Sequence, residues 1–87
     1  MVFIKQADYV KDYQVHLIFN TGEEGVVDLS DVLDMFEAAQ PLKDLAVFQN
    51  FYLDSWPTLA WQCGFDLAPE MLYERVTGKK HQWQQAM

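Results

Sequence analysis

Apolar and polar residues alternate along the first third of the chain. From Tyr13 to Phe19 every second residue is apolar or aromatic, which is the period of a β-strand with one buried face. A β-branched run at 25–28 follows the polar stretch 20–23, in which Gly22 can adopt a positive φ. These two runs predict an antiparallel hairpin. A further strand is predicted upstream at Val2-Phe3-Ile4, to which Tyr9-Val10 can add, and the charged stretch between Lys5 and Asp12 is expected to make turns.

The spacing of apolar residues changes to that of a helix after residue 28. Apolar side chains recur at i, i+3, i+4 and i+7 with acidic side chains on the other face, which predicts an amphipathic helix. Asp28 or Ser30 can cap its first N–H groups, and Gln40-Pro41 is expected to end it, because a residue before proline avoids the helical conformation. The apolar positions are Leu29, Val32, Leu33 and Phe36, and the acidic ones are Asp31, Asp34 and Glu37.

Shorter patterns fill the middle of the chain. Leu42, Leu45 and Phe48 predict a short helical turn. The runs 51–54 and 58–61 then predict a second hairpin, joined around Ser55-Trp56-Pro57.

A final helix is predicted after residue 68. Pro69 suits its first turn, Leu72 and Val76 share its inner face, and Gly78 is placed to end it. The bases that follow, Lys79 and Lys80, complement the negative end of the helix dipole.

The predicted elements follow the order β-β-β-α-β-β-α, which is an α+β fold. We expect a small antiparallel sheet of about five strands, built from two hairpins and packed with two to three short helices. No repeat or linker divides the chain, so residues 1–78 are expected to form a single domain. Residues 79–87 are a C-terminal tail that we expect to be flexible or to dock on a partner.

Charge and composition narrow the functions available to such a domain. The formal net charge is −7, so binding to nucleic acid through phosphate neutralisation is not expected. Cys63 is the only cysteine, which excludes an intrachain disulfide and a multi-thiolate metal site and indicates a reducing cytoplasm. The apolar start, residues 1–5, is too short for a signal peptide, and no run is long enough to span a membrane.

The candidate chemistry is sparse, and we expect no catalytic residue, cofactor or metal. The histidines, His16 and His81, lie on a predicted strand and in the tail, away from a nucleophile. Cys63 is expected to pack as a small hydrophobic residue, with a reactive thiol as the alternative. The acids of the first helix lack calcium-loop spacing and are expected to be solvated or to act as caps.

The segment from Trp61 to Tyr73 is the most distinctive part of the chain. Trp61 ends a strand, Gly64 permits a turn, and Asp66 can cap the helix that Pro69 and Glu70 begin. The functional alternative is a ligand-binding or catalytic site made by Asp66, Glu70 and Tyr73.

Aromatic residues also suggest a binding surface. One of Phe51 and Tyr52 is expected to point away from the core, and Trp56 lies in a turn. Tyr52 and Trp56 are therefore candidate interaction aromatics. Burial of an exposed hairpin edge or of this patch against a second copy predicts homodimerisation.

The chain resembles a family of short bacterial proteins known as domain of unknown function twenty-four forty-two. The likeness covers nearly the whole chain, and its most specific part is Thr58-Leu59-Ala60-Trp61 through Gly64, Asp66-Leu67-Ala68-Pro69-Glu70 and Leu72-Tyr73. The resemblance implies a stand-alone protein or an amino-terminal module joined to a helix-turn-helix. It also implies a gene that often lies beside that of another small protein, an arrangement similar to toxin–antitoxin pairs. The resemblance implies no catalytic residues.

Two functions remain open from the sequence. The first is a non-enzymatic protein-interaction or regulatory module, such as the acidic member of a toxin–antitoxin-like pair, because the chain is acidic and lacks a catalytic set. The alternative is a small ligand-binding protein or enzyme that uses the region of Asp66, Glu70 and Tyr73.

Overall fold

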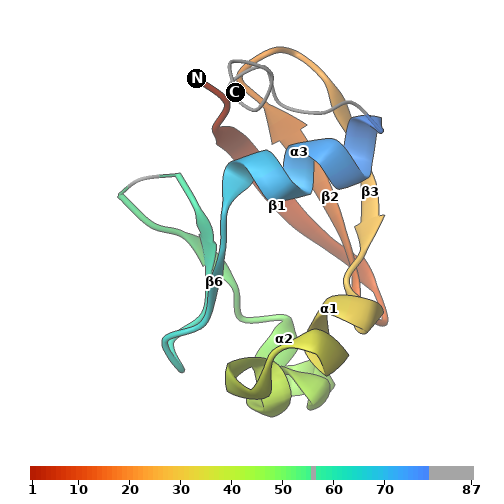
Figure 1. Cartoon of the computed structure of the whole chain (residues 1–87), viewed down its shortest axis with the longest axis vertical. Coiled ribbons are helices and arrows are strands. Elements are labelled where there is room, and N and C mark those ends of the chain that lie inside the picture. The colour runs from red at the N-terminus through yellow and green to blue at the C-terminus, as the bar shows by residue number, and fades with distance from the viewer. Residues whose placement is uncertain (56, 79–87) are drawn as a thin grey trace.

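The amino-terminal half of the chain folds into a three-stranded antiparallel sheet. In the computed structural model, which describes residues 1–55 and 57–78, its strands are β1 (Ile4–Lys11), β2 (Gln14–Phe19) and β3 (Glu24–Asp28), in that order across the sheet (Figure 1). Gly22 makes the β2–β3 turn with a φ of 91°. The predicted hairpin is confirmed. A strand does lie upstream, but the turns expected between Lys5 and Asp12 are wrong, because β1 runs through that stretch and pairs with β2.

Alternation along β2 separates a buried face from a partly solvated one. Val15, Leu17 and Phe19 are fully buried, whereas His16 and Ile18 lie on the opposite face and are half-buried. The polar and apolar pattern therefore sets which face of the sheet carries the core.

Three short helical segments follow the sheet: α1 (Ser30–Met35), the 3-10 helix η1 (Glu37–Lys43) and α2 (Leu45–Phe48). Asp28 accepts a hydrogen bond from the N–H of Ser30, the first residue of α1, at 2.9 Å, but Leu29 occupies the N-cap position without a side-chain bond. The prediction that Gln40-Pro41 ends the first helix is wrong. Phe36 is extended and packs its ring 5.7 Å from that of Phe65, so this tertiary contact ends α1 before the proline is reached.

A second three-stranded antiparallel sheet contains β4 (Tyr52–Leu53), β5 (Leu59–Ala60) and β6 (Asp66–Leu67), with β5 in the middle. The expected single sheet of about five strands is thus corrected to two sheets of three strands each. Strand β6 was missed because two residues are too short to show a period, and only their pairing with β5 defines them.

The last element, α3 (Pro69–Thr77), begins and ends as predicted. Pro69 occupies its first turn, and Gly78 adopts the left-handed conformation at its end, donating its N–H to the Glu74 carbonyl at 2.8 Å. Figure 1 shows α3 lying across the first sheet, where it contacts β3. A Cβ atom on Gly25 would come within 2.8 Å of the Val76 Cγ1 atom, so this glycine permits the close packing.

An aromatic cluster joins the helical segments to the second sheet. Trp61 is 2% exposed, and its indole N–H donates to the Phe48 carbonyl at 2.9 Å. Among the described residues no polar or charged side chain is buried, so the core is built from apolar and aromatic groups. Ring centroids lie 5.8 to 6.4 Å apart in the pairs Phe48–Phe51, Phe48–Trp61, Phe51–Trp61 and Trp61–Phe65.

Candidate functional site

The first part of the Trp61–Tyr73 segment has a structural role. Gly64 adopts a φ of 101°, and its N–H donates to the Trp61 carbonyl at 3.0 Å. The Trp61 N–H in turn donates to the Phe65 carbonyl at 2.9 Å. This tight turn connects β5 to β6, which confirms the turn expected at Gly64.

Asp66 does not cap the last helix, so that prediction is wrong. It is exposed and pairs with Ala60 in the second sheet, and Ala68 stands at the N-cap position without a side-chain bond. Pairing in β6 places Asp66 two residues ahead of the position from which a side chain caps a helix. Glu70 does lie in the first turn, where a carboxylate favours the positive end of the dipole.

Tyr73 faces the first sheet. Its hydroxyl donates to the carboxylate of Glu23, and its ring packs edge-on against Phe19 with centroids 5.3 Å apart. Asp66, Glu70 and Tyr73 are therefore directed to a strand face, a helix start and a packing contact, and the structure does not bring them together as a site.

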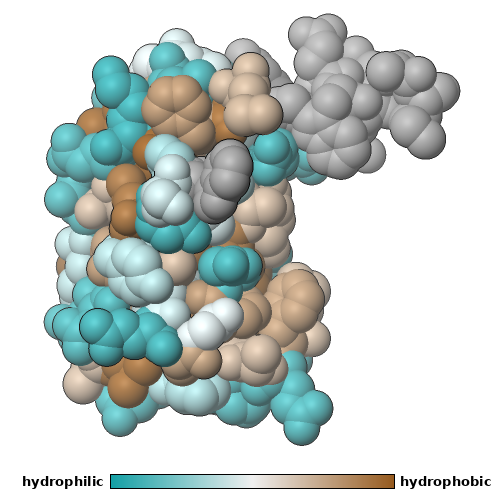
Figure 2. Space-filling view, turned by 90° about the vertical axis from the view of Figure 1, so that its left-hand side faces the viewer, coloured by the Kyte–Doolittle hydropathy of each residue, from teal (hydrophilic) through white to brown (hydrophobic). Residues whose placement is uncertain are grey.

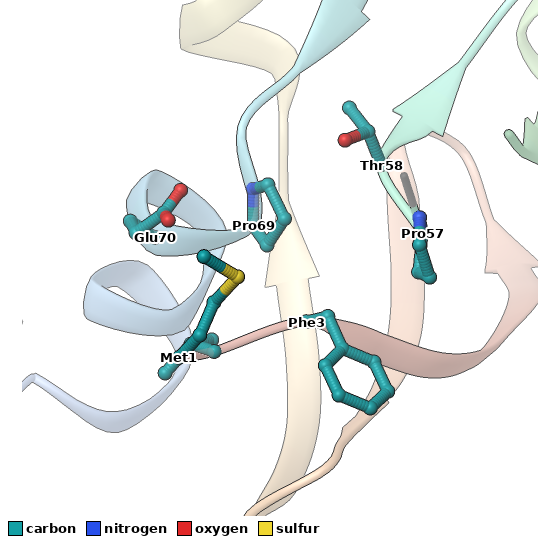
Figure 3. Close-up of a pocket in the computed structure, with 7 residues that line it drawn as sticks. Met1, Phe3, Pro57, Thr58, Pro69 and Glu70 are labelled. Carbon is teal, nitrogen blue, oxygen red and sulfur yellow. The ribbon is translucent and has the colours of Figure 1, made fainter. Parts of the chain in front are cut away.

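A pocket of about 390 Å³ lies at the start of α3 (Figure 3). It is bounded by the segment that leads into β1, by the loop between β4 and β5, and by the first turn of the helix. Its wall is mostly apolar, and Glu70 is the one charged side chain among the lining residues. The lining residues are Met1, Val2, Phe3, Pro57, Thr58, Pro69 and Glu70.

Asn20 holds the amino-terminal wall of this pocket in place. Its Oδ1 atom accepts from the Phe3 N–H and its Nδ2 atom donates to the Met1 carbonyl, both at 2.8 Å. The Asn20 N–H also donates to the Phe3 carbonyl at 3.0 Å. The sequence indicated Asn20 only as a turn residue, because the two backbone groups that it bridges lie far from it along the chain.

The opposite wall is fixed by the β4–β5 hairpin. The Thr58 N–H donates to the Asp54 carboxylate at 3.0 Å, and the Asp54 N–H donates to the Thr58 carbonyl at 3.1 Å. The Ile4 N–H reaches the Pro57 carbonyl at 3.4 Å and so links the two walls.

Apolar surface remains available beside this pocket. Met1 is 99% exposed and Phe3 is 37% exposed. On the side shown in Figure 2, hydrophobic areas are separated by hydrophilic residues and do not merge into one large patch. Such a surface is suited to anchoring single side chains more than to burying a broad apolar interface.

The acids of the first helix are engaged with neighbouring groups. The Arg75 guanidinium donates to both Asp31 oxygens, at 2.6 and 3.1 Å, and lowers the pKa of that carboxyl below its ordinary value. Hydrogen bonds from Ser30 likewise lower the pKa of Asp28. Asp34 pairs with Lys43 at 2.9 Å. Across residues 1–55 and 57–78, no three metal-ligating side chains are grouped.

The remaining candidates that the structure describes do not line the pocket. Cys63 is exposed, so the expectation that it packs in the core is wrong; it occupies the turn between β5 and β6, outside the apolar cluster. His16 Nε2 lies 2.9 Å from Glu24 Oε1.

Tyr52 is 46% exposed while Phe51 packs on the core, as the alternation predicted. Trp56 and the tail 79–87, with Lys79, Lys80 and His81, lie outside the described residues.

Comparisons with known proteins identify a family and a fold. The family model described as "Protein of unknown function (DUF2442)" matches residues 4–78. No curated protein matches the chain. The crystal structure of a proposed DNA-binding protein from Nitrosomonas europaea ATCC 19718 is similar, with a TM-score of 0.77 and 19% sequence identity over 90% of this chain. The match spans 50% of that protein. No helix in the described part of the chain has the length and apolar character needed to cross a bilayer.

Proposed function

The chain belongs to the DUF2442 family of proteins of unknown function, and we propose that it is a non-enzymatic protein-interaction domain that binds an apolar side chain of a partner in the pocket beside Phe3 and Pro69. The observation that carries this proposal is the mostly apolar wall of that pocket. Its volume of about 390 Å³ is near the lower end of the range found for binding pockets. One bulky side chain of a partner suits such a volume.

The chemistry of the lining residues supports binding over catalysis. Nucleophilic catalysis requires a hydroxyl or thiol beside an oriented base, and general acid–base catalysis requires a positioned pair of titratable groups. The lining contributes a single carboxylate, Glu70, and a single hydroxyl, Thr58, with no histidine, cysteine or lysine. The enzyme hypothesis based on Asp66, Glu70 and Tyr73 therefore receives no support from their placement.

Electrostatics favours a basic partner protein. The chain carries a formal net charge of −7, and Glu70 supplies a negative charge at the pocket wall. A basic partner is attracted to such a surface, whereas a nucleic-acid backbone is repelled by it. The likeness to a proposed DNA-binding protein concerns the fold and only half of that protein. A regulatory pair of this acidic chain with a basic protein, acting in the cytoplasm, fits these features.

Co-expression with the product of the adjoining gene tests this proposal. We expect a stable complex, with Kd measured by isothermal titration calorimetry. Phe3→Ala is expected to weaken it by about tenfold or more, because truncation of a residue that lines the binding pocket removes a central contact.

Phe36→Ala is the matched control. Phe36 is 44% exposed, similar to Phe3, but does not line the pocket, so its truncation should leave Kd within about twofold of the wild-type value. Absence of a complex, or equal weakening by the two variants, contradicts the proposal. A second copy of the chain is the other candidate partner, and sedimentation equilibrium of the isolated protein measures that association.

A further inference from the structure

The outer edge of β3 is a regular strand edge, and within residues 1–55 and 57–78 no backbone group bonds to its outward side. Strand β3 ends the order β1-β2-β3, and it forms the right-hand margin of the sheet in Figure 1. Its register with β2 runs from Gln14↔Asp28 to Ile18↔Glu24 without a bulge. An edge of this kind can pair with a further strand.

The hydrogen bonds at both ends of the hairpin show which groups point outward. The Phe19 N–H donates to the Glu23 carbonyl and the Leu29 N–H donates to the Tyr13 carbonyl, each at 2.9 Å. Hydrogen-bonded pairs alternate along an antiparallel ladder. The backbone N–H and C=O groups of the odd-numbered β3 residues therefore point toward β2. The backbone N–H and C=O groups of the even-numbered residues, Glu24, Val26 and Asp28, therefore point away from the sheet.

The side chains along this edge have a distinctive order. Val26 is 52% exposed and lies between two exposed acids, Glu24 and Asp28. All three lie on the face opposite the buried Val27, since successive residues of a strand alternate between faces. The edge thus presents acid, apolar and acid side chains at two-residue intervals.

This order opposes pairing with a second copy. In an antiparallel β3–β3 pair that uses the whole strand, Glu24 of each copy lies opposite Asp28 of the other copy. The pair therefore contains two acid–acid contacts. Like charges in directly opposed positions destabilise a strand pair.

We propose that the β3 edge binds an extended segment of a partner protein that carries Lys or Arg at two positions four residues apart, with an apolar residue midway between them. In antiparallel pairing the two bases lie opposite Glu24 and Asp28, and the apolar residue lies opposite Val26. Backbone hydrogen bonds supply affinity and the side-chain order supplies selectivity. This surface lies on β3, whereas the pocket proposed above is lined by other residues, so either site can fail without the other.

A peptide experiment on the unmodified full chain tests the class of partner. One heptapeptide carries Lys at its second and sixth positions, Val at its fourth and Thr elsewhere; a control peptide carries Glu in place of Lys. NMR hydrogen exchange is measured at each backbone amide. At millimolar concentration the Lys peptide should slow exchange of the Glu24 and Val26 amides by about fivefold, and the Glu peptide should not. Equal slowing by both peptides, or none by the Lys peptide, overturns the proposal.

Charge reversal on the edge gives an independent test through self-association. Glu24→Lys turns two repulsive cross-strand pairs into attractive ones, so sedimentation equilibrium should show dimerisation about tenfold tighter than in the wild type. Glu24→Gln, which removes repulsion without adding attraction, should fall between them. Adding Val26→Pro to Glu24→Lys removes an outward N–H and should abolish the dimer. Circular dichroism checks that each variant folds. Equal association of the wild type and Glu24→Lys overturns the proposal.

Discussion

The two edges of the first sheet are built in different ways. Strand β1 is interrupted by register shifts between Ile4 and Gln6 and between Tyr9 and Lys11, and its Ile4 N–H contacts the loop before β5. Strand β3 pairs regularly over its whole length and exposes outward backbone groups. Bulges and coverage protect an edge from further pairing, whereas a regular edge invites it. One small sheet thus has an edge with register shifts and a bond to a loop, and a second edge whose pairing positions are regular.

At β3, charged side chains rather than bulges oppose pairing with a second copy. Glu24 and Asp28 discourage copies of the chain from pairing, but they leave the backbone groups accessible to a segment of opposite charge. Selectivity at this edge thus depends on side chains, while closure at β1 depends on backbone geometry.

Breaking the support behind β3 is expected to have the largest effect. Gly25→Val places methyl groups where a Cβ atom alone would already lie 2.8 Å from Val76 Cγ1, so the Val76 side chain or α3 must shift. We expect the free energy of unfolding to fall by about 2 kcal/mol, as for other overpacked sites, measured by urea denaturation. Combining it with Val76→Ala should restore part of this loss. A neutral Gly25→Val variant contradicts the packing of α3 on β3.

Loosening the β1 end is expected to have a smaller effect. Asn20→Ala removes two side-chain hydrogen bonds to Met1 and Phe3, and we expect the free energy of unfolding to fall by about 1 to 2 kcal/mol. Asn50→Ala is the control, because Asn50, just after α2, donates one exposed side-chain bond to the Ala46 carbonyl. Hydrogen exchange at the Phe3 amide should accelerate in Asn20→Ala and stay unchanged in Asn50→Ala. Equal exchange in both variants argues against the clamp.

The ion pair that joins α3 to the helix after β3 is expected to contribute least. Asp31 is bound by Arg75, which lowers the pKa of Asp31 in the folded protein relative to its ordinary value of 3.8. The stabilisation is therefore present above that ordinary value and is lost as the pH falls through the folded pKa. Asp31→Asn should cost less than about 0.5 kcal/mol at neutral pH, because both side chains are partly exposed and screened.

Thermal denaturation at several pH values measures this contribution. The difference between Asp31→Asn and the wild type should vanish in strong acid, where the Asp31 carboxyl is protonated. Asp34→Asn is the control, because it removes the exposed ion pair between Asp34 and Lys43, which does not involve α3. A difference for Asp31→Asn that persists in acid would show that its effect does not come from the ion pair.

Elements with a sustained pattern could be predicted from the sequence. The hairpin of β2 and β3 follows from alternation, and α3 follows from its inner face together with Pro69 and Gly78. The exposure of Tyr52 next to the packed Phe51 follows from the same period of two. These properties depend on neighbours along the chain, so local pattern is enough to determine them.

The candidate sites required contacts between distant segments. Asp66 was predicted as a cap because it precedes a helix, but pairing with Ala60 makes it part of a strand. Phe36 ends α1 where it meets Phe65. The pocket needs Asn20 to hold residues that lie at the start of the chain.

The sequence by itself determined the α+β class, the buried face of the first sheet and the acidic character of the surface. The tertiary structure decided that the strands form two sheets, that no strand in the described part of the chain pairs with the outer side of β3, and that Phe3, Pro57 and Pro69 enclose a pocket. The physical reason is that periodicity encodes which way a side chain points within its own element. Which strand it pairs with, and what covers it, depend on packing between segments far apart in the sequence.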